Sequence, residues 1–187
     1  MVAYGDSLTA GYGLPKSAAF PYQLEQKLKA RGHSVKIINA GVTGDTTASG
    51  LARLNHSLPR QADAVILELG ANDALRGVDP RVTAKNLELI VTHIKKRGIP
   101  ILLAGMLAPP HMGRAYTTRF KSIFYDIARR HGVLFYPFFL KGVALRPNLN
   151  QFDRMHPNAA GVNVIVNGIL PTAERLVVKA SKQTRRN

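Results

Sequence analysis

Residues 64–73 read AVILELGAND, and this stretch decides the kind of sheet that the chain can form. Its first part, Ala64–Leu69, is a short apolar run, which is typical of a strand buried on both faces of a parallel sheet. Its second part, Gly70–Asp73, is polar and begins with glycine, which predicts a loop directly after the strand. Other apolar runs of the chain also end in polar, glycine-containing loops, so we expect several such strands side by side.

Amphipathic stretches separate these apolar runs. We expect strands at Val2–Tyr4, Val35–Asn39, Ala64–Leu69, Ile101–Met106 and Val133–Tyr136. We expect helices at Phe20–Arg31, Thr46–Leu58 (with Asp45 as a candidate cap), Val82–Arg97 and Thr117–His131, and a final helix over Ala159–Lys179 that Gly168 or Pro171 interrupts. Strands that alternate with helices in this way predict a three-layer α/β/α fold, with a parallel sheet between two layers of helices.

The length and composition of the chain fit one globular domain. It has 187 residues, of which 45% are hydrophobic and 20% are charged. We expect residues 1–180 to form a single catalytic domain and residues 181–187 to form a basic, frayed tail. Cysteine is absent, which excludes disulfides, thiolate metal sites and a cysteine nucleophile.

The chain is strongly basic, with 26 lysines and arginines against 11 acidic residues and a net charge of +15. Such a charge can indicate a nucleic-acid or membrane partner. The basic residues are scattered, however, and no aromatic side chains alternate with them in a pattern that would stack on bases. We therefore expect a solvated basic surface and no nucleic-acid partner. No apolar run approaches 18 residues, so we expect no transmembrane segment.

The polar residues that follow the strands are the candidates for function, because ligands of parallel sheets bind beyond the carboxyl ends of the strands. Gly5-Asp6-Ser7 follows the first strand, Thr43-Gly44-Asp45 follows the second, and Gly70-Ala71-Asn72-Asp73 follows the third. In a sheet of strand order 2-1-3-4-5 the first and third strands flank the point where the order reverses. Ser7 and Asn72 would then be neighbours.

A serine becomes a strong nucleophile only when a base takes its proton. Of the six histidines, His156 alone lies in a loop with a carboxylate, Asp153, three residues before it. Asp153 could hold the Nδ1 proton of His156 and leave Nε2 facing the hydroxyl of Ser7. A D-x-x-H pair also occurs by chance, and Gly-Asp-Ser after a strand is equally compatible with a turn and a helix cap.

Such a nucleophile also needs donors for the negative oxygen that forms on the substrate. The backbone N–H of Ser7, at a strand-to-helix junction, and the N–H of Gly44 are candidates, as is the side-chain amide of Asn72. Asn72 could instead be a turn residue, and Gly44 a bend before a helix.

Taken together, these motifs resemble the four sequence blocks of the SGNH, or GDSL, hydrolases. The blocks are Gly5-Asp6-Ser7-Leu8, Gly44 within Thr43-Gly44-Asp45, Gly70-x-Asn72-Asp73 and Asp153-x-x-His156-Pro157, in the order and at the spacing of that family. Three longer strings, GDSLTAGYGLP (5–15), NAGVTGDTTASGLARL (39–54) and LELGANDALRG (67–77), are similar to the bacterial multifunctional esterases, thioesterases and lysophospholipases. The resemblance runs from about Val2 to about Leu170.

The resemblance implies a flavodoxin-like, five-stranded parallel sheet of order 2-1-3-4-5 and the hydrolysis of carboxylic esters or thioesters through an acyl-enzyme. Ser7 would be the nucleophile, His156 the base and Asp153 the residue that orients it. The N–H groups of Ser7 and Gly44 and the amide of Asn72 would form the oxyanion hole. No metal or organic cofactor is implied.

The same resemblance suggests the substrates. Short-chain or aryl esters come first, with thioesters and lysophospholipids as further candidates, and a carbohydrate O-acetylesterase would use the same triad. The segments Leu75–Asp79 and Leu107–Tyr116 would line the substrate pocket, so its expected residues are Asp73, Leu75, Arg76, Leu107 and Pro109. The family implies a periplasmic or secreted protein if a leader was removed upstream, and a cytoplasmic one otherwise. The oligomeric state is left open.

Overall fold

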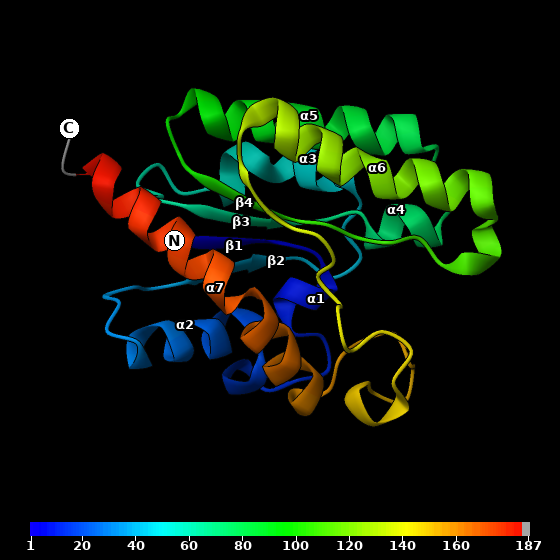
Figure 1. Ribbon diagram of the computed structural model, residues 1–187, viewed down its shortest axis with the longest axis horizontal. Coiled ribbons are helices and arrows are strands. Elements are labelled where there is room, and N and C mark those ends of the chain that lie inside the picture. The colour runs from blue at the N-terminus through cyan, green and yellow to red at the C-terminus, as the bar shows by residue number, and fades with distance from the viewer. Residues whose placement is uncertain (185–187) are drawn as a thin grey trace.

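The computed structural model describes residues 1–184 and contains a parallel sheet of five strands (Figure 1). The strands are β1 (Val2–Gly5), β2 (Ile38–Gly41), β3 (Val65–Glu68), β4 (Ile101–Ala104) and β5 (Leu134–Tyr136). They lie in the order β2-β1-β3-β4-β5, and every neighbouring pair is parallel. The predicted fold class and strand order are therefore confirmed.

Helices cover both faces of the sheet (Figure 1). On one face lie α2 (Phe20–Ala30) and α7 (Ala159–Thr184), and on the other lie α3 (Thr47–Ser57), α5 (Pro80–Lys96) and α6 (Arg114–His131). Two short helices, α1 (Ser7–Ala10) and α4 (Ala71–Leu75), directly follow β1 and β3. Single 3₁₀ turns occur at Lys16–Ala18, Pro110–Met112 and Pro147–Leu149.

The three central strands are buried along their whole length. Every residue of β1, β3 and β4 is buried, whereas β2 at the edge of the sheet exposes Ile38 and Asn39. This difference follows from the topology, because a central strand of a two-faced sheet has helices above and below it. No helix within residues 1–184 is both long and apolar enough to cross a membrane.

Several predicted element boundaries differ from those of the structure by a few residues, and two of the differences have clear local reasons. The second strand begins at Ile38 instead of Val35, because Ile38 pairs with Val2, the first residue of β1, and earlier residues have no strand beside them. Helix α3 is capped by Thr46 and not by Asp45: the Thr46 side chain accepts a hydrogen bond from the Ser49 N–H, and the Ser49 hydroxyl accepts one from the Thr46 N–H.

The final helix is longer than predicted, because α7 runs through Gly168 and Pro171 without a break to Thr184. A side chain at position 168 would place its Cβ 2.5 Å from the hydroxyl oxygen of Tyr136, so glycine here permits close packing on β5. Residues 181–184 of the expected frayed tail are thus helical. The rest of that tail, residues 185–187, lies outside the described residues.

A pair of buried carboxyl groups lies at the ends of β1 and β3. Glu68 is the last residue of β3, Asp6 follows β1, and both side chains are fully buried. The Thr9 hydroxyl donates to Glu68 Oε2 at 2.8 Å, and the Leu8 N–H donates to Asp6 Oδ1 at 2.9 Å.

Burial raises the pKa of Glu68 well above its usual range, and the neighbouring Asp6 raises it further. Burial also raises the pKa of Asp6, to about 6. The pair therefore keeps a proton near neutral pH.

This pair makes the stability of the fold depend on pH. The folded-state pKa of Glu68 lies above its unfolded value, so its contribution is present below about pH 4.5 and is lost as the pH rises through the folded pKa. We predict that Glu68→Gln, which resembles the protonated side chain, folds and loses less stability than the wild type between pH 5 and pH 8. Urea unfolding of both proteins at the two pH values measures this, with an expected difference of about 1 kcal/mol or more. An equal loss in both proteins would show that Glu68 does not carry this proton.

Candidate active site

Ser7 is the first residue of α1, and the turn before it is held tightly. Asp6 caps this short helix through its bond to the Leu8 N–H. A side chain at Gly5 would place its Cβ 2.5 Å from the carbonyl oxygen of Glu68, so only glycine lets β1 end this close to β3. As the first helical residue, Ser7 has an N–H with no partner one turn earlier. Its side chain is 7% exposed at the carboxyl end of the sheet.

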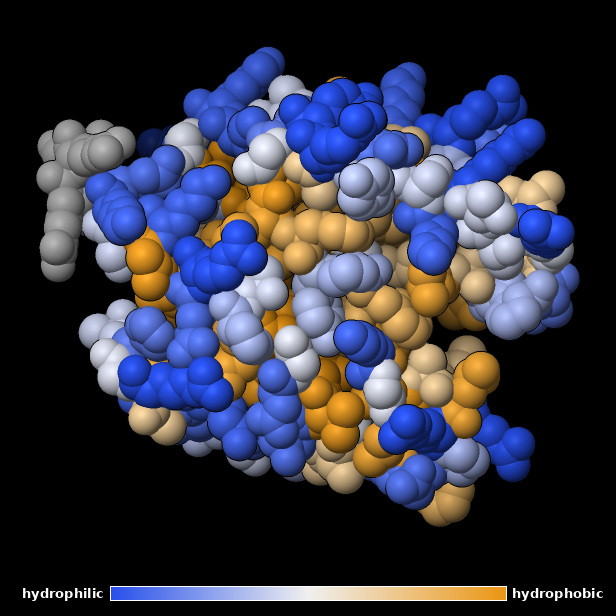
Figure 2. Space-filling model, in the orientation of Figure 1, coloured by the Kyte–Doolittle hydropathy of each residue, from blue (hydrophilic) through white to orange (hydrophobic). Residues whose placement is uncertain are grey.

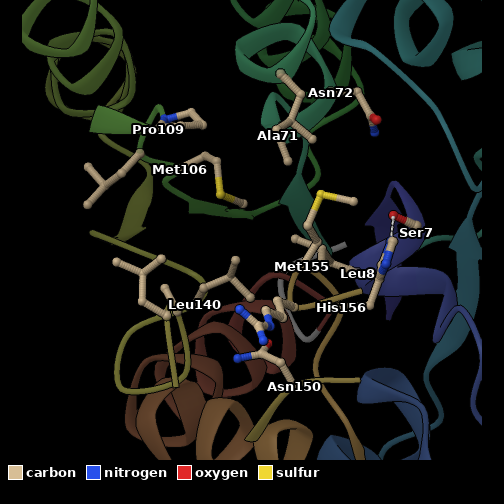
Figure 3. Close-up of a pocket in the computed structure, with 15 residues that line it drawn as sticks. Ser7, Leu8, Ala71, Asn72, Met106, Pro109, Leu140, Asn150, Met155 and His156 are labelled. Carbon is tan, nitrogen blue, oxygen red and sulfur yellow. Dashed lines mark hydrogen bonds between the residues drawn. The ribbon is translucent and has the colours of Figure 1, made fainter. Parts of the chain in front are cut away.

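His156 and Asp153 meet Ser7 across the sheet edge. His156 Nε2 lies 3.0 Å from Ser7 Oγ (Figure 3). On the other side of the ring, His156 Nδ1 lies 2.6 Å from Asp153 Oδ2. The other carboxylate oxygen of Asp153 accepts hydrogen bonds from the backbone N–H groups of Met155 and His156, at 2.9 and 3.0 Å. Burial alone would raise the pKa of Asp153, but these bonds outweigh it and lower the pKa to about 2. An ionised Asp153 can thus orient His156 so that Nε2 takes the hydroxyl proton.

Two residues that no motif singled out support the imidazole. The ring of Tyr12 lies against that of His156, with ring centroids 4.6 Å apart. The side chain of Gln151 donates to the carbonyl oxygens of Tyr12, at 2.7 Å, and Pro157, at 3.0 Å. The Gln151 N–H also donates to the His156 carbonyl at 2.8 Å. Gln151 thereby ties the histidine loop to the segment after α1.

The expected oxyanion donors lie at the same edge. Gly44 has a φ of +85°, which favours glycine, although the nearest atom to an added Cβ is 3.9 Å away. Its backbone conformation, not lack of space, is therefore the constraint. Asn72 Nδ2 donates to the Asp45 carbonyl at 2.9 Å and to Asp6 Oδ2 at the longer distance of 3.3 Å. The amide of Asn72 therefore has two hydrogen-bond partners, and the bond to Asp6 is the weaker by its length.

Arg53 fixes the loop that carries Gly44. Its Nε donates to Asp45 Oδ2 at 2.5 Å, and its Nη2 donates to the Gly5 carbonyl at 3.0 Å. The guanidinium carbon lies 4.1 Å from the ring centre of Tyr4, whose hydroxyl donates to the Gly50 carbonyl. One arginine on α3 therefore joins the ends of β1 and β2. The sequence did not predict this role, because nothing in the helical spacing of Arg53 distinguishes it from a surface arginine.

A cavity of about 230 Å³ opens beside Ser7 and His156 (Figure 3). Leu75, Leu107 and Pro109 line it, as the sequence analysis expected. Its wall is mainly apolar, and the sequence analysis missed Met106, Leu140 and Met155, which also contribute to it. Met106 and Leu140 lie in the segments that follow β4 and β5, where apolar residues give no signal separate from that of the core.

Two expected pocket residues lie elsewhere. The Asp73 side chain is buried, and its carboxylate accepts hydrogen bonds from the Thr47 N–H at 2.8 Å and from the hydroxyls of Thr47 and Thr83. It joins α4 to α3 and α5 instead of facing a substrate. Arg76 is exposed outside the cavity wall and donates to the Gly44 carbonyl at 3.0 Å.

Comparison with known proteins agrees with this geometry. The family model of the GDSL-like lipase/acylhydrolases matches residues 3–164. An arylesterase of Vibrio mimicus is 38% identical over 158 residues, which cover 84% of this chain and 79% of that protein. The thioesterase 1/protease 1/lysophospholipase L1 of Escherichia coli K12 is 38% identical over 159 residues, covering 84% of this chain and 75% of that protein. The crystal structure of TesA superposes with a TM-score of 0.89 at 33% identity, covering 94% of this chain and 98% of that one.

The matched residues span the segments that carry Ser7, Gly44, Asn72, Asp153 and His156. The fold, the geometry of these side chains and the sequence match over most of the chain all point to the same family. The chain belongs to the GDSL-like lipase/acylhydrolase family.

Proposed function

We propose that the protein is a serine hydrolase that cleaves carboxylic esters through an acyl-enzyme on Ser7. The observation that carries the proposal is the continuous chain of contacts from Ser7 Oγ through the imidazole of His156 to the carboxylate of Asp153. The names of the relatives, arylesterase and thioesterase/lysophospholipase, point to the same chemistry.

In the first half of the reaction, Ser7 Oγ attacks the acyl carbonyl while His156 Nε2 takes the hydroxyl proton. The bond between the acyl carbon and the leaving oxygen then breaks, and His156 returns the proton to the leaving alcohol. In the second half, water loses a proton to His156 and attacks the acyl-enzyme. The bond between the acyl carbon and Ser7 Oγ then breaks, and His156 returns the proton to Oγ, which releases the acid and restores Ser7. Asp153 stays ionised and stabilises the imidazolium, because its pKa of about 2 is far below neutrality.

The negative charge that forms on the carbonyl oxygen needs donors that are already in place. We assign this role to the N–H groups of Ser7 and Gly44 and to the side-chain amide of Asn72. Ser7 and Asn72 line the same cavity, and the hydrogen bond from Asn72 to the Asp45 carbonyl holds its amide next to Gly44. Because Arg53 fixes Asp45 and Arg76 binds the Gly44 carbonyl, this part of the site needs little reorganisation.

The cavity favours compact apolar ester substrates. Its volume of about 230 Å³ is below the usual range for drug-sized ligands, which is roughly 300–1,000 Å³. Its apolar wall, with Leu75, Leu107 and Pro109, suits a short acyl chain or the aromatic ring of a phenol leaving group. We therefore rank short-chain and aryl esters first, ahead of thioesters and lysophospholipids.

Removing the nucleophile tests the proposed function. We predict that Ser7→Ala abolishes hydrolysis of a short p-nitrophenyl ester, because no other group can form the acyl-enzyme. Ser122→Ala, which removes an exposed hydroxyl on α6, serves as the matched control and should retain wild-type activity. Wild-type rates in Ser7→Ala would disprove the mechanism.

A panel of acetylated sugars separates the O-acetylesterase alternative, which predicts faster turnover of those esters than of aryl esters.

Removing one oxyanion donor should slow the chemical step without unfolding the protein. We predict that Asn72→Ala lowers kcat by about 10²–10³ and leaves KM nearly unchanged, because the lost bond forms fully only in the transition state. Steady-state kinetics on the same ester measures both constants, and Asn163→Ala, at an exposed site on α7, is the control. An unchanged kcat would remove Asn72 from the oxyanion hole.

A further inference from the structure

The segment between β5 and α7, residues 137–158, exposes large apolar side chains beside the active site. We call this segment the rim loop. Phe152 is fully exposed, Leu145 is 87% exposed, and Met155 is 51% exposed. In Figure 1 the rim loop extends from the sheet at the lower right, and Figure 2 shows hydrophobic and hydrophilic residues intermixed over that region. Exposing several large apolar side chains to water on one loop needs a physical reason.

The exposed residues do not reflect a loosely packed loop. Phe139 and Val143, in the first half of the rim loop, are fully buried. The Asn150 side chain donates to the carbonyls of Val143 and Arg146, both at 2.8 Å, and Asn150 forms an antiparallel bridge with Pro157. The fold therefore holds a fixed scaffold from which Leu145 and Phe152 project.

The backbone of the rim loop is strained at two residues, Leu145 and Arg154. Within residues 1–184, Leu145 and Arg154 are the non-glycine residues with positive φ, at 63° and 60°. A left-handed conformation costs a residue with a Cβ about 1–2 kcal/mol. Burial of Leu145 in the core does not offset this cost, because its side chain lies in solvent. Strain of this kind tends to persist where a conformation serves function.

The charges of the rim loop are almost all positive. It carries Lys141, Arg146 and Arg154, all of them exposed, and within residues 1–184 none of the three forms an ion pair. Its single acidic residue, Asp153, is occupied by His156. The loop thus combines apolar side chains with unpaired cations, which is the composition of peripheral segments that rest on anionic membranes.

The rim loop also borders the cavity. Leu145, Arg154 and Met155 contribute to its wall together with Ser7 and His156. A surface that contacts Phe152 and Leu145 would consequently lie against the entrance through which an acyl chain reaches Ser7. Phe152, Lys141 and Arg146 are not part of the cavity wall, so they can be changed without altering the cavity itself.

We propose that the rim loop docks the protein onto the surface of an anionic phospholipid bilayer. Phe152 and Leu145 enter the boundary between head groups and acyl chains, and Lys141, Arg146 and Arg154 contact the lipid phosphates. Docking presents the active-site entrance to the lipid surface, where ester substrates with acyl chains are concentrated. This proposal goes beyond ester hydrolysis, and docking does not depend on the catalytic reaction.

Vesicle cosedimentation of the full chain with the change Ser7→Ala tests docking apart from catalysis. We expect binding to vesicles containing phosphatidylglycerol and at least tenfold weaker binding to pure phosphatidylcholine vesicles. Each basic residue near an anionic surface contributes about fivefold to the partition coefficient. We therefore expect Lys141→Glu with Arg146→Glu to lower partitioning by more than tenfold, and Phe152→Ser to lower it severalfold.

Matched controls separate docking from the general charge of the protein. Lys85→Glu with Lys121→Glu makes the same change in net charge at exposed positions on α5 and α6, and Tyr125→Ser removes an exposed aromatic ring from α6. Both should bind within about twofold of the parent. If the control pair lost as much binding as the rim-loop pair, attraction would be a property of the whole surface and the proposal would be wrong. Absence of binding to anionic vesicles would also overturn it.

Insertion can be observed directly, because the chain has no tryptophan. Phe152→Trp places a single indole at the proposed contact, and Tyr125→Trp places one on α6. With anionic vesicles, the emission of the first should move to shorter wavelength and be quenched by brominated acyl chains, whereas that of the second should not change. If the Phe152→Trp protein cosedimented with vesicles but its tryptophan emission did not change, the rim loop would not be the contact. Binding to duplex DNA and not to anionic vesicles would also overturn the proposal, because the basic surface would then serve a nucleic acid and not a bilayer.

Discussion

The parallel pairing of β1 between β2 and β3 is the constraint on which the site depends. Because all three strands run the same way, their carboxyl ends meet at one edge and bring Ser7, Gly44 and Asn72 together from segments far apart in the sequence. The pairing is possible because the residues of β1 and β3 are mainly apolar or small, the Tyr4 hydroxyl has a hydrogen-bond acceptor, and burial raises the pKa of Glu68. Burial of these strands therefore positions the chemical groups as well as stabilising the fold.

The histidine reaches this edge by a different route. His156 belongs to a long segment without regular strands, yet it lies 3.0 Å from a serine 149 residues earlier in the chain. Within residues 1–184, no strand holds this segment in place. The side-chain hydrogen bonds of Gln151 to Tyr12 and Pro157, together with those of Asn150, fix its backbone instead. Fixing this segment has a conformational entropy cost, and the buried Phe139 and Val143 offset part of it. The same scaffold leaves Phe152 and Leu145 facing solvent.

The sequence predicted those parts that depend on short-range pattern. Buried apolar runs located the strands, and glycine with polar residues after them located Ser7 and Asn72. The structure brings these residues together with Asp153 and His156. What could not be predicted depends on three-dimensional partners. Asp73 stands one residue from Asn72, but its direction is set by Thr47 and Thr83 on other helices. Pro171 should break an isolated helix, but the packing of α7 on α2 and the sheet overrides that preference.

Acylation of Ser7, activated by His156 and Asp153, is the step on which the proposed function depends. Incubation with an organophosphonate that reacts with activated serines, followed by peptide mass spectrometry, tests this most directly. We expect one adduct per chain, located on Ser7 and absent from the His156→Ala protein, because the hydroxyl is not activated without its base. An adduct on another residue, or ester hydrolysis by a protein that forms no adduct on Ser7, would contradict it.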